Sequence, residues 1–85
     1  MEIEFDPDKE ATNLAKHGIS LRRAEDFTAL NVERDTRFDY GEERYRAWGV
    51  IEGDTYCFAF TIRSAGVRAI SLRRAHEREM KRNVP

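Results

Sequence analysis

The spacing of apolar residues changes along the chain, and each change marks an element. Apolar and polar residues alternate over residues 2–5, which predicts a short strand. A helical period follows and predicts a helix over residues 7–17. Asp6 and Pro7 suit the beginning of this helix, because an aspartate accepts bonds from exposed backbone N–H groups and a proline needs no partner there. Gly18 suits its end, where the backbone commonly turns left-handed.

A second helix is predicted over residues 21–30, with Ser20 as its N-cap. Its apolar residues recur every three positions and form a narrow stripe, which is made of Leu21, Ala24, Phe27 and Leu30. A stripe of this kind is typical of a helix that packs on a core. The two helices are therefore expected to form a hairpin that lies on a sheet.

The second half of the chain returns to a period of two. Residues 34–40 indicate a weak strand or an irregular connection, and Gly53-Asp54 resembles a short hairpin loop. Three strands and a terminal helix are predicted there, over residues 43–51, 56–63, 67–72 and 74–82. The element order predicts one α+β domain over residues 1–85. An antiparallel sheet carries the N-terminal helix pair on one face, and a short helix ends the chain.

The composition limits what this domain can hold. A chain of 85 residues buries only about 60–65% of its unfolded surface, which favours a surface site over an enclosed cofactor cavity. Cys57 is the single cysteine and lies in an apolar run, so a buried, inert thiol is expected. One cysteine and two distant histidines do not match a zinc site, and we expect neither a metal nor a cofactor. The acidic N-terminus and the lack of a long apolar stretch predict a cytoplasmic protein without a membrane segment.

Charge is distributed unevenly, although the net charge is only −1. Residues 1–60 contain 8 Lys/Arg and 14 Asp/Glu, a net −6, whereas residues 61–85 contain 7 and 2, a net +5. Most cations of the second segment are arginines, whose planar guanidinium group binds phosphate oxygens in pairs. This pattern favours a face that binds a polyanion. The alternative is a solvated basic surface that balances the acidic helices.

Strand alternation predicts which arginines share a face of the sheet. Arg44, Arg46 and Trp48 alternate together on one strand, and Arg63 ends the small-residue face of the next. In the last strand the shared face is expected to contain Val67, Ala69, Ser71 and Arg73. Arginines from three strands would then converge, or else form a salt-bridged sheet surface. Trp48 is either a packed core aromatic or a platform on which a nucleic-acid base stacks.

Two titratable side chains are candidates for proton transfer. His17 lies at the expected end of the first helix, where a histidine interacts favourably with the helix dipole. Since histidines titrate near neutral pH, it is either a structural residue or a general acid or base. Glu42 directly precedes the strand predicted over residues 43–51, and it is the carboxylate best placed to act as a base.

Four sequence elements occur in an order and spacing that resemble one known family. Two of them are the run Phe5-Asp6-Pro7-Asp8-Lys9 with Asn13-Leu14-Ala15-Lys16-His17-Gly18-Ile19-Ser20, and the element Gly41-Glu42-Glu43-Arg44. The others are Thr61-Ile62-Arg63 and Arg68-Ala69-Ile70-Ser71-Leu72-Arg73-Arg74-Ala75, with Glu79 behind them. Together they span almost the whole chain and resemble the BrnT-type toxins, the ribonuclease halves of BrnT/BrnA type II toxin–antitoxin systems.

This resemblance implies a RelE-like fold of the microbial ribonuclease type and cleavage of RNA without a metal or cofactor. It also implies a small BrnA-type antitoxin that covers the toxin, typically in a heterotetramer. The antitoxin would carry the DNA-binding domain, so the toxin would reach DNA only through it.

On this interpretation the ribose 2′-OH attacks its own phosphate. Arg63 and Arg73 are the expected stabilisers of the phosphorane charge, with Arg44 as a third. His17 or Glu42 is the expected general base or acid. The remaining contacts to RNA are expected from Lys16, Trp48, Arg68 and Arg74.

Two other functions are compatible with the same residues. The basic face suits a non-catalytic binding module for nucleic acid or protein, or an inactive relative that acts as a corepressor. Single arginine substitutions separate these functions from catalysis. A binder loses affinity in steps of about 1–3 kcal/mol, whereas an enzyme loses turnover steeply and keeps its affinity for RNA.

Overall fold

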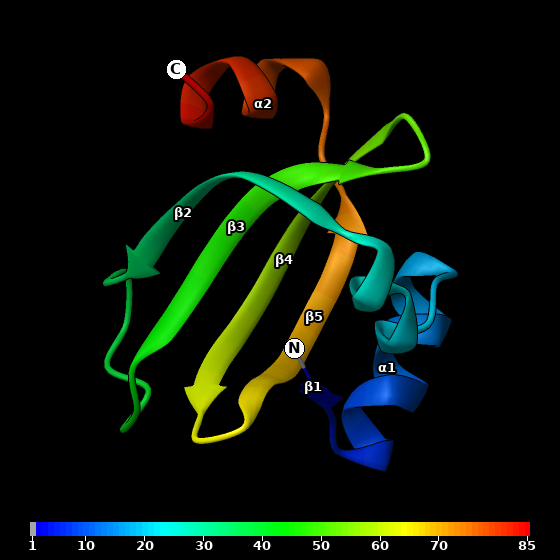
Figure 1. The fold of residues 1–85 in the computed structure, drawn as a ribbon, viewed down its shortest axis with the longest axis vertical. Helices are drawn as coiled ribbons and strands as arrows, with labels where there is room; N and C mark the ends of the chain where they lie inside the picture. Colours follow the sequence, from blue (N-terminus) through cyan, green and yellow to red (C-terminus); the bar gives the residue numbers. More distant parts are fainter. Residues whose placement is uncertain (1) are drawn as a thin grey trace.

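The computed structural model describes residues 2–85 and contains one five-stranded sheet (Figure 1). In chain order the elements are β1 (Glu2–Glu4), α1 (Pro7–His17), the 3₁₀ helix η1 (Leu21–Asp26), β2 (Thr28–Asp35), β3 (Arg44–Ile51), β4 (Asp54–Arg63), β5 (Gly66–Arg74) and α2 (Glu77–Asn83). The strands lie in the order β1-β5-β4-β3-β2. The β1–β5 pair is parallel and the other pairs are antiparallel. The α+β class is confirmed, with a mixed sheet in place of the antiparallel one.

The predicted beginning and end of α1 are confirmed. The Asp6 side chain accepts a hydrogen bond from the backbone N–H of Asp8 at 2.7 Å, and Pro7 is the first helical residue. Gly18 has φ 69°, in the left-handed region that favours glycine, and its N–H donates to the carbonyl of Leu14 at 3.0 Å. Local sequence therefore determines both ends of this helix.

The prediction of a second helix over residues 21–30 is wrong. Residues 21–26 form only the 3₁₀ helix η1, and β2 begins at Thr28, earlier than the weak strand expected over 34–40. A 3₁₀ helix has three residues per turn, which explains why apolar residues recur every three positions there. The chain after η1 pairs with β3 instead of extending the helix. The sheet therefore carries one N-terminal α-helix and not a helix pair.

The strands of the second half are confirmed with small shifts. The hairpin between β3 and β4 turns at Glu52 and Gly53, with φ 49° and 85°. Two positive φ values are typical of a type I′ turn, in which glycine is favoured. Asp54 is therefore the first residue of β4 and not part of the loop. The terminal helix is also confirmed, but it begins at Glu77.

A bulge in β5 changes which of its residues share a face. The register of β5 against β4 shifts between Ala69 and Ser71, which leaves Ile70 as an additional residue. Ala69 and Ser71 consequently lie on opposite faces, and the expectation that they share one is wrong. Strict alternation fails because it assumes an unbroken ladder. The arginine that shares a face with Arg73 is Arg68.

The sheet has two different faces. The core face carries the main hydrophobic cluster, to which the strands contribute Ala47, Ile51, Phe58, Phe60, Val67, Ala69 and Leu72. Leu21 and Ala24 of η1 pack against this cluster. The opposite face, which we call the arginine face, is defined by Arg44, Arg46, Thr61, Arg63, Arg68 and Arg73. The side chains of adjacent residues in a strand thus point to opposite faces of the sheet.

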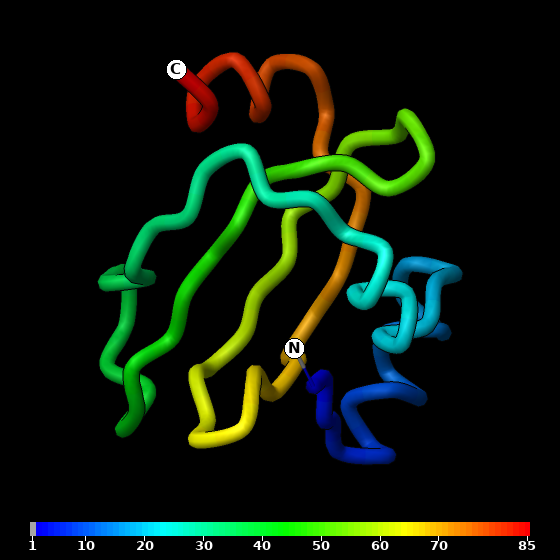
Figure 2. The backbone as a smooth tube through the Cα atoms, viewed as in Figure 1, coloured from blue at the N-terminus to red at the C-terminus, as the bar shows by residue number. Residues whose placement is uncertain are grey.

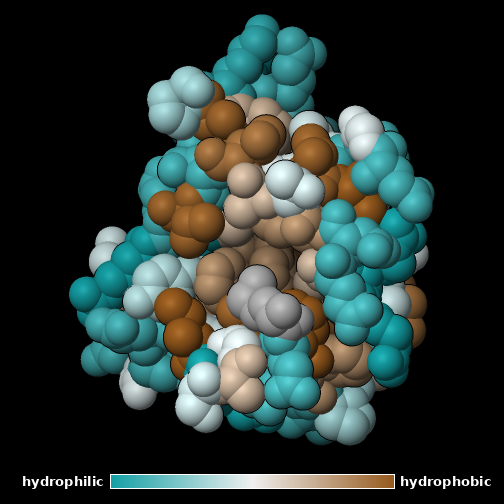
Figure 3. All heavy atoms as spheres, in the orientation of Figure 1, coloured by the Kyte–Doolittle hydropathy of each residue, from teal (hydrophilic) through white to brown (hydrophobic). Residues whose placement is uncertain are grey.

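Part of the core face is open. Since α1 and η1 pack mainly against β5 and β1, the side of the face formed by β2 and β3 is left uncovered. Apolar side chains surround a hollow of about 410 Å³ there (Figure 3). Ile62, which lines it, is 62% exposed, and Val32 is half-exposed. The open area follows from the shortness of η1.

The helix α2 lies over one end of the sheet (Figure 2). It forms a second hydrophobic cluster on the arginine-face side, made of Trp48, Cys57, Ala75, Met80 and Val84. No helix within residues 2–85 has the length and apolar character needed to cross a bilayer.

Candidate nucleic-acid interface

Arginines from three strands meet in one hollow on the arginine face. This arginine hollow has a volume of about 200 Å³ and is lined by Arg44 of β3, Arg63 of β4 and Arg68 of β5. The predicted meeting of arginines from three strands is found for Arg44 and Arg63, but β5 contributes Arg68 and not the expected Arg73. They share a face because Thr61 pairs with Arg68, while Arg63 alternates with Thr61. The other lining residues are Asp6, Lys9, Glu42, Thr61, Ala69 and Ile70.

Arg44 and Glu42 form a charged pair at the rim of the arginine hollow. Arg44 Nε donates to Glu42 Oε2 at 3.0 Å. The guanidinium group also lies over the ring of Tyr40, with Cζ 4.3 Å from the ring centroid. Gly41 has φ 73°, which lets the chain turn into β3 at this point. The Gly41-Glu42-x-Arg44 element therefore places one carboxylate and one guanidinium group side by side.

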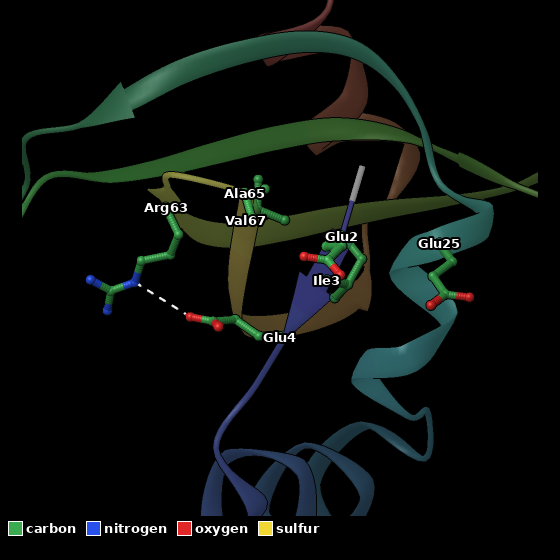
Figure 4. A pocket seen from close by; sticks show the side chains of 8 residues that line it. Glu2, Ile3, Glu4, Glu25, Arg63, Ala65 and Val67 are labelled. Carbon is green, nitrogen blue, oxygen red and sulfur yellow. Dashed lines mark ion pairs between the residues drawn. The ribbon is translucent and has the colours of Figure 1, made fainter.

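The other two arginines of the hollow are held more loosely. Arg63 Nε lies 3.6 Å from Glu4 Oε1 (Figure 4). Arg68 Nη2 lies 3.9 Å from Asp6 Oδ2. Ion pairs between solvent-accessible side chains contribute roughly 0–1 kcal/mol. A phosphate group, which accepts two parallel hydrogen bonds from a guanidinium group, therefore competes well with these carboxylates.

Two buried donors of the arginine face, Arg46 Nε and Thr61 Oγ1, have no hydrogen-bond partner among residues 2–85. A buried polar group without a partner costs about 1–3 kcal/mol. Arg46 pairs with Ala59, two residues before Thr61, so both donors face the same side of neighbouring strands. Arg46 Nε lies 4.0 Å from Oδ2 of Asp35, so the donor that faces the arginine hollow is Thr61 Oγ1.

A buried carboxylate orders the loop between β2 and β3. Asp35 Oδ1 accepts from Arg37 N at 3.2 Å and Arg37 Nε at 2.9 Å, and its Oδ2 accepts from Arg37 Nη2 at 2.8 Å and Tyr40 Oη at 3.0 Å. The Arg37 guanidinium group is the main reason why the pKa of Asp35 lies well below its usual range. The pairing raises the pKa of Arg37 in turn. The loop over residues 36–43 is thereby tied to the end of β2.

Arg73 lies at the other end of the arginine face. Its Nη1 and Nη2 donate to Glu79 Oε1 and Oε2, both at 2.8 Å. This bidentate pair lowers the pKa of Glu79 to about 2 and raises the pKa of Arg73. Arg73 pairs with Cys57, four residues before Thr61, which is about 13 Å along the strand. Arg73 therefore attaches α2 to the sheet and is not part of the arginine hollow.

Trp48 is a packed core aromatic, so its interpretation as a stacking platform is wrong. Its exposed fraction is 0%, and its Nε1 donates to Glu79 Oε2 at 3.1 Å. The cause is α2, which folds over this end of the arginine face and which alternation within one strand does not reveal. Cys57 is buried beside it, and burial raises the pKa of the thiol.

Three further candidates lie outside the arginine hollow. Lys16 and His17 occupy the exposed last turn of α1, and His17 is about 12 Å along the helix axis from Lys9. Arg74 pairs with Tyr56 and its guanidinium group lies over the Tyr56 ring at 5.5 Å, on the core-face side. The structure thus brings together Glu42, Arg44, Arg63 and Arg68.

Sequence reasoning did not select Lys9 or Thr61 as site residues, and it named Arg46 only as a member of the converging arginines. Alternation carried the signal for two of them, because Arg46 follows Arg44 on the same side of β3 and Thr61 precedes Arg63 on the same side of β4. Lys9 had no such signal, since its place at the hollow depends on how α1 packs beside β5.

Within residues 2–85, no three histidine, cysteine or acidic side chains come together as metal ligands do. The described residues define a small α+β domain whose arginine hollow can hold a phosphate group and whose Glu42 can accept a proton. A basic hollow of this kind is typical of proteins that bind a nucleic-acid backbone.

Comparison with known proteins agrees with this class. The family model described as "Ribonuclease toxin, BrnT, of type II toxin-antitoxin system" matches residues 5–79. The chain therefore belongs to the BrnT family, the ribonuclease toxins of type II toxin–antitoxin systems. The 1.1 Å crystal structure of the Brucella abortus ribonuclease toxin BrnT is similar, with 27% identity and a TM-score of 0.67 over 91% of this chain and 99% of that chain. No curated protein matches the sequence.

Proposed function

We propose that this toxin is a metal-independent endoribonuclease whose active site is the arginine hollow. The observation that carries the proposal is the convergence of Arg44, Arg63 and Arg68 on one hollow that also contains Glu42. Donors fixed before the reaction stabilise the charge of a phosphorane, because they need no reorganisation in the transition state. A RelE-like fold of the microbial ribonuclease type belongs to the same proposal.

The proposed reaction begins when Glu42 accepts the proton of the ribose 2′-OH. The 2′-oxygen attacks the adjacent phosphorus, and the bond from phosphorus to the 5′-oxygen breaks. Lys9, whose side chain lines the same hollow, gives a proton to the leaving oxygen. The products are a 2′,3′-cyclic phosphate and a 5′-hydroxyl end. Arg44, 3.0 Å from Glu42, orients the carboxylate for the first step.

The other candidate residues take supporting roles in this proposal. Lys16 and His17 lie at the periphery and contact flanking phosphates of a longer RNA, whereas Arg74, whose guanidinium group lies on the core-face side, takes no part in the proposed site. Arg73 acts as a positioning residue that holds α2 through Glu79. Glu42 takes the proton instead of His17, because Glu42 lines the arginine hollow and His17 does not.

The proposed partner is a BrnA-type antitoxin, bound in a cytoplasmic heterotetramer that reaches DNA through the antitoxin. The open apolar hollow of the core face supports this part of the proposal, since soluble monomers rarely leave a large apolar patch uncovered. Acidic side chains flank the hollow where it adjoins β1, namely Glu2, Glu4 and Glu25 (Figure 4). The matching antitoxin segment carries apolar side chains followed by Lys or Arg.

The test of catalysis is RNA cleavage by the purified toxin in the presence of a metal chelator. Arg44→Ala is the test variant and Arg74→Ala, which removes an arginine outside the hollow, is the matched control. Cleavage by the wild type and the control, with loss in Arg44→Ala, supports the proposal. Equal cleavage by all three would place the activity elsewhere or in a contaminant.

The ends of the cleaved RNA test the chemistry separately. A 2′,3′-cyclic phosphate on the upstream fragment agrees with attack by the ribose oxygen. A 5′-phosphate on the downstream fragment would show that water was the nucleophile and would overturn the proposed role of Glu42.

A further inference from the structure

We propose that the loop between β2 and β3 is a stacking ledge, on which Phe38 binds an unstacked base of single-stranded RNA beside the phosphate held at Arg44. The inference rests on the proposed function and adds a substrate subsite to it. The stacking ledge consists of Phe38 and Tyr40.

The ledge is continuous with the arginine hollow. The ring centroids of Phe38 and Tyr40 are 5.9 Å apart, in a nearly perpendicular arrangement. Tyr40 in turn lies under the Arg44 guanidinium group, 4.3 Å from its Cζ. A phosphate bound at Arg44 would therefore have an aromatic ring next to it, at the position where its own or the neighbouring base needs a surface.

Phe38 is the most exposed large apolar side chain of the described residues, at 69%. A single exposed apolar residue is common and by itself indicates nothing. Here the exposed ring lies on a loop that is held in place on both sides of Phe38. Arg37 and Tyr40 both donate to the buried carboxylate of Asp35. The fold thus orders the loop while it leaves the Phe38 ring in solvent.

The position of the ledge favours a nucleic-acid base over a protein partner. Asp35, to which the loop is tied, pairs with Arg44 and belongs to the arginine face. The apolar hollow of the core face is lined by other residues and lies on the opposite side of the sheet. Flat aromatic rings beside guanidinium groups are the usual way in which proteins hold unstacked bases.

Trp48 strengthens the inference because it removes the competing platform. The indole is fully buried under α2. Among the aromatic residues of the arginine-face side, the loop residues are those that reach solvent next to the arginine hollow. A duplex would not present its bases to such a ledge, so the substrate class is single-stranded RNA.

The experiment measures binding of a short single-stranded RNA that carries a 2′-deoxy nucleotide at the cleavage position, so that it is bound and not cut. Phe38→Ala is the test variant, and Phe38→Trp should restore binding. Leu30→Ala, which shortens an exposed apolar side chain in β2 and leaves the loop unchanged, is the matched control. We expect Phe38→Ala to weaken binding about 5- to 150-fold, the range that base–aromatic stacking gives. The slope of affinity against salt should not change, because no phosphate contact is lost.

A second RNA, with an abasic site at the ledge position, identifies the contact. Removal of the base should cost the wild type as much affinity as Phe38→Ala does, and the variant should lose almost nothing further. Additive losses from the two changes would overturn the stacking contact.

The outcomes separate this inference from the proposed function. If wild type and Phe38→Ala bind the RNA equally, the ledge is wrong while the arginine hollow stands. If Phe38→Ala weakens only the complex with the antitoxin, the loop is a protein contact and the inference is also wrong. If the wild type neither binds nor cleaves RNA, both proposals fail.

Discussion

The two faces of the sheet are made by the same strands and differ in almost every physical property. The core face presents aromatic and aliphatic side chains and is partly open. The arginine face presents guanidinium groups, carboxylates such as those of Asp35 and Glu42, and two buried donors without a hydrogen-bond partner among residues 2–85. Adjacent residues such as Phe60 and Thr61 belong to different faces because strand side chains alternate. A domain of this size can therefore keep a basic surface and an apolar surface apart by the thickness of one sheet, and we have proposed that these bind RNA and the antitoxin respectively.

The largest expected effect comes from removing the chemistry of the arginine face. Glu42→Gln and Arg44→Ala should each lower kcat about 10²- to 10⁴-fold, since they remove the proposed general base and a proposed donor to the phosphorane. Initial rates with a fluorescent RNA measure this loss. The melting temperature should fall only slightly, because the Arg44–Glu42 pair is partly exposed to solvent and such pairs contribute little to stability.

Arg74→Ala is the control for that comparison. It removes one positive charge, as Arg44→Ala does, but from the core-face side of the sheet. If Arg74→Ala lost as much activity as Arg44→Ala, net charge and not the arginine hollow would determine the rate.

The second largest effect is expected from loss of the Asn13 side chain, which hydrogen-bonds to the backbone of β5. Asn13 is buried; its Nδ2 donates to the carbonyls of Leu72 at 2.8 Å and Ile19 at 2.9 Å, and its Oδ1 accepts from Leu72 N at 3.0 Å. Asn13→Ala leaves these backbone groups without partners and should lower the free energy of unfolding by about 2–4 kcal/mol. Urea unfolding measures the change. Thr12→Ala, on the exposed side of α1, should not destabilise the fold, since alanine is the better helix former, and an equal loss there would contradict the assigned role of the Asn13 hydrogen bonds.

Glu79 should make stability depend on pH at the covered end of the arginine face. Its pKa is lowered in the folded chain from the ordinary 4.5 to about 2, chiefly by the hydrogen bonds from Arg73. The folded state therefore binds this proton more weakly than the unfolded state, so the stabilisation is full above about pH 4.5 and is lost as the pH falls towards 2. Glu79→Gln should cost about 1–3 kcal/mol at neutral pH and much less near pH 2.

Urea unfolding of wild type and Glu79→Gln over this pH range measures that difference. A difference that stayed constant with pH would mean that packing of α2, and not the carboxylate charge, provides the stabilisation.

The sequence was sufficient for the parts of the fold that depend on local signals. Asp6, Pro7 and Gly18 determine the ends of α1, and alternation identified β3, β4 and β5. It was also sufficient for the convergence of Arg44 and Arg63. Each of these predictions needs only neighbours in the chain.

The errors arose where distant segments decide the outcome. Residues 21–30 have an apolar stripe, but pairing with β3 draws the chain after Asp26 into a strand. The bulge at Ile70 places the residues of β5 on either side of it on faces that strict alternation does not predict. The helix α2 covers Trp48. The spacing of apolar residues within a single element does not predict such contacts between distant segments. Of the candidate residues, Glu42 and Arg44 therefore lie together at the arginine hollow, whereas Trp48 lies in the core.

The smallest expected change in the isolated toxin comes from the core face. Ile62 is 62% exposed at the apolar hollow, so Ile62→Lys should alter the free energy of unfolding by no more than about 0.5 kcal/mol. RNA cleavage should be unchanged, since the arginine hollow is on the other side. Binding of a BrnA-type antitoxin should weaken at least about tenfold, because a charge replaces an apolar contact in the interface. Leu30→Lys, outside the hollow, is the matched control, and calorimetry measures both variants. If Ile62→Lys abolished cleavage, or if both variants bound the antitoxin as the wild type does, the division of function between the two faces would be wrong.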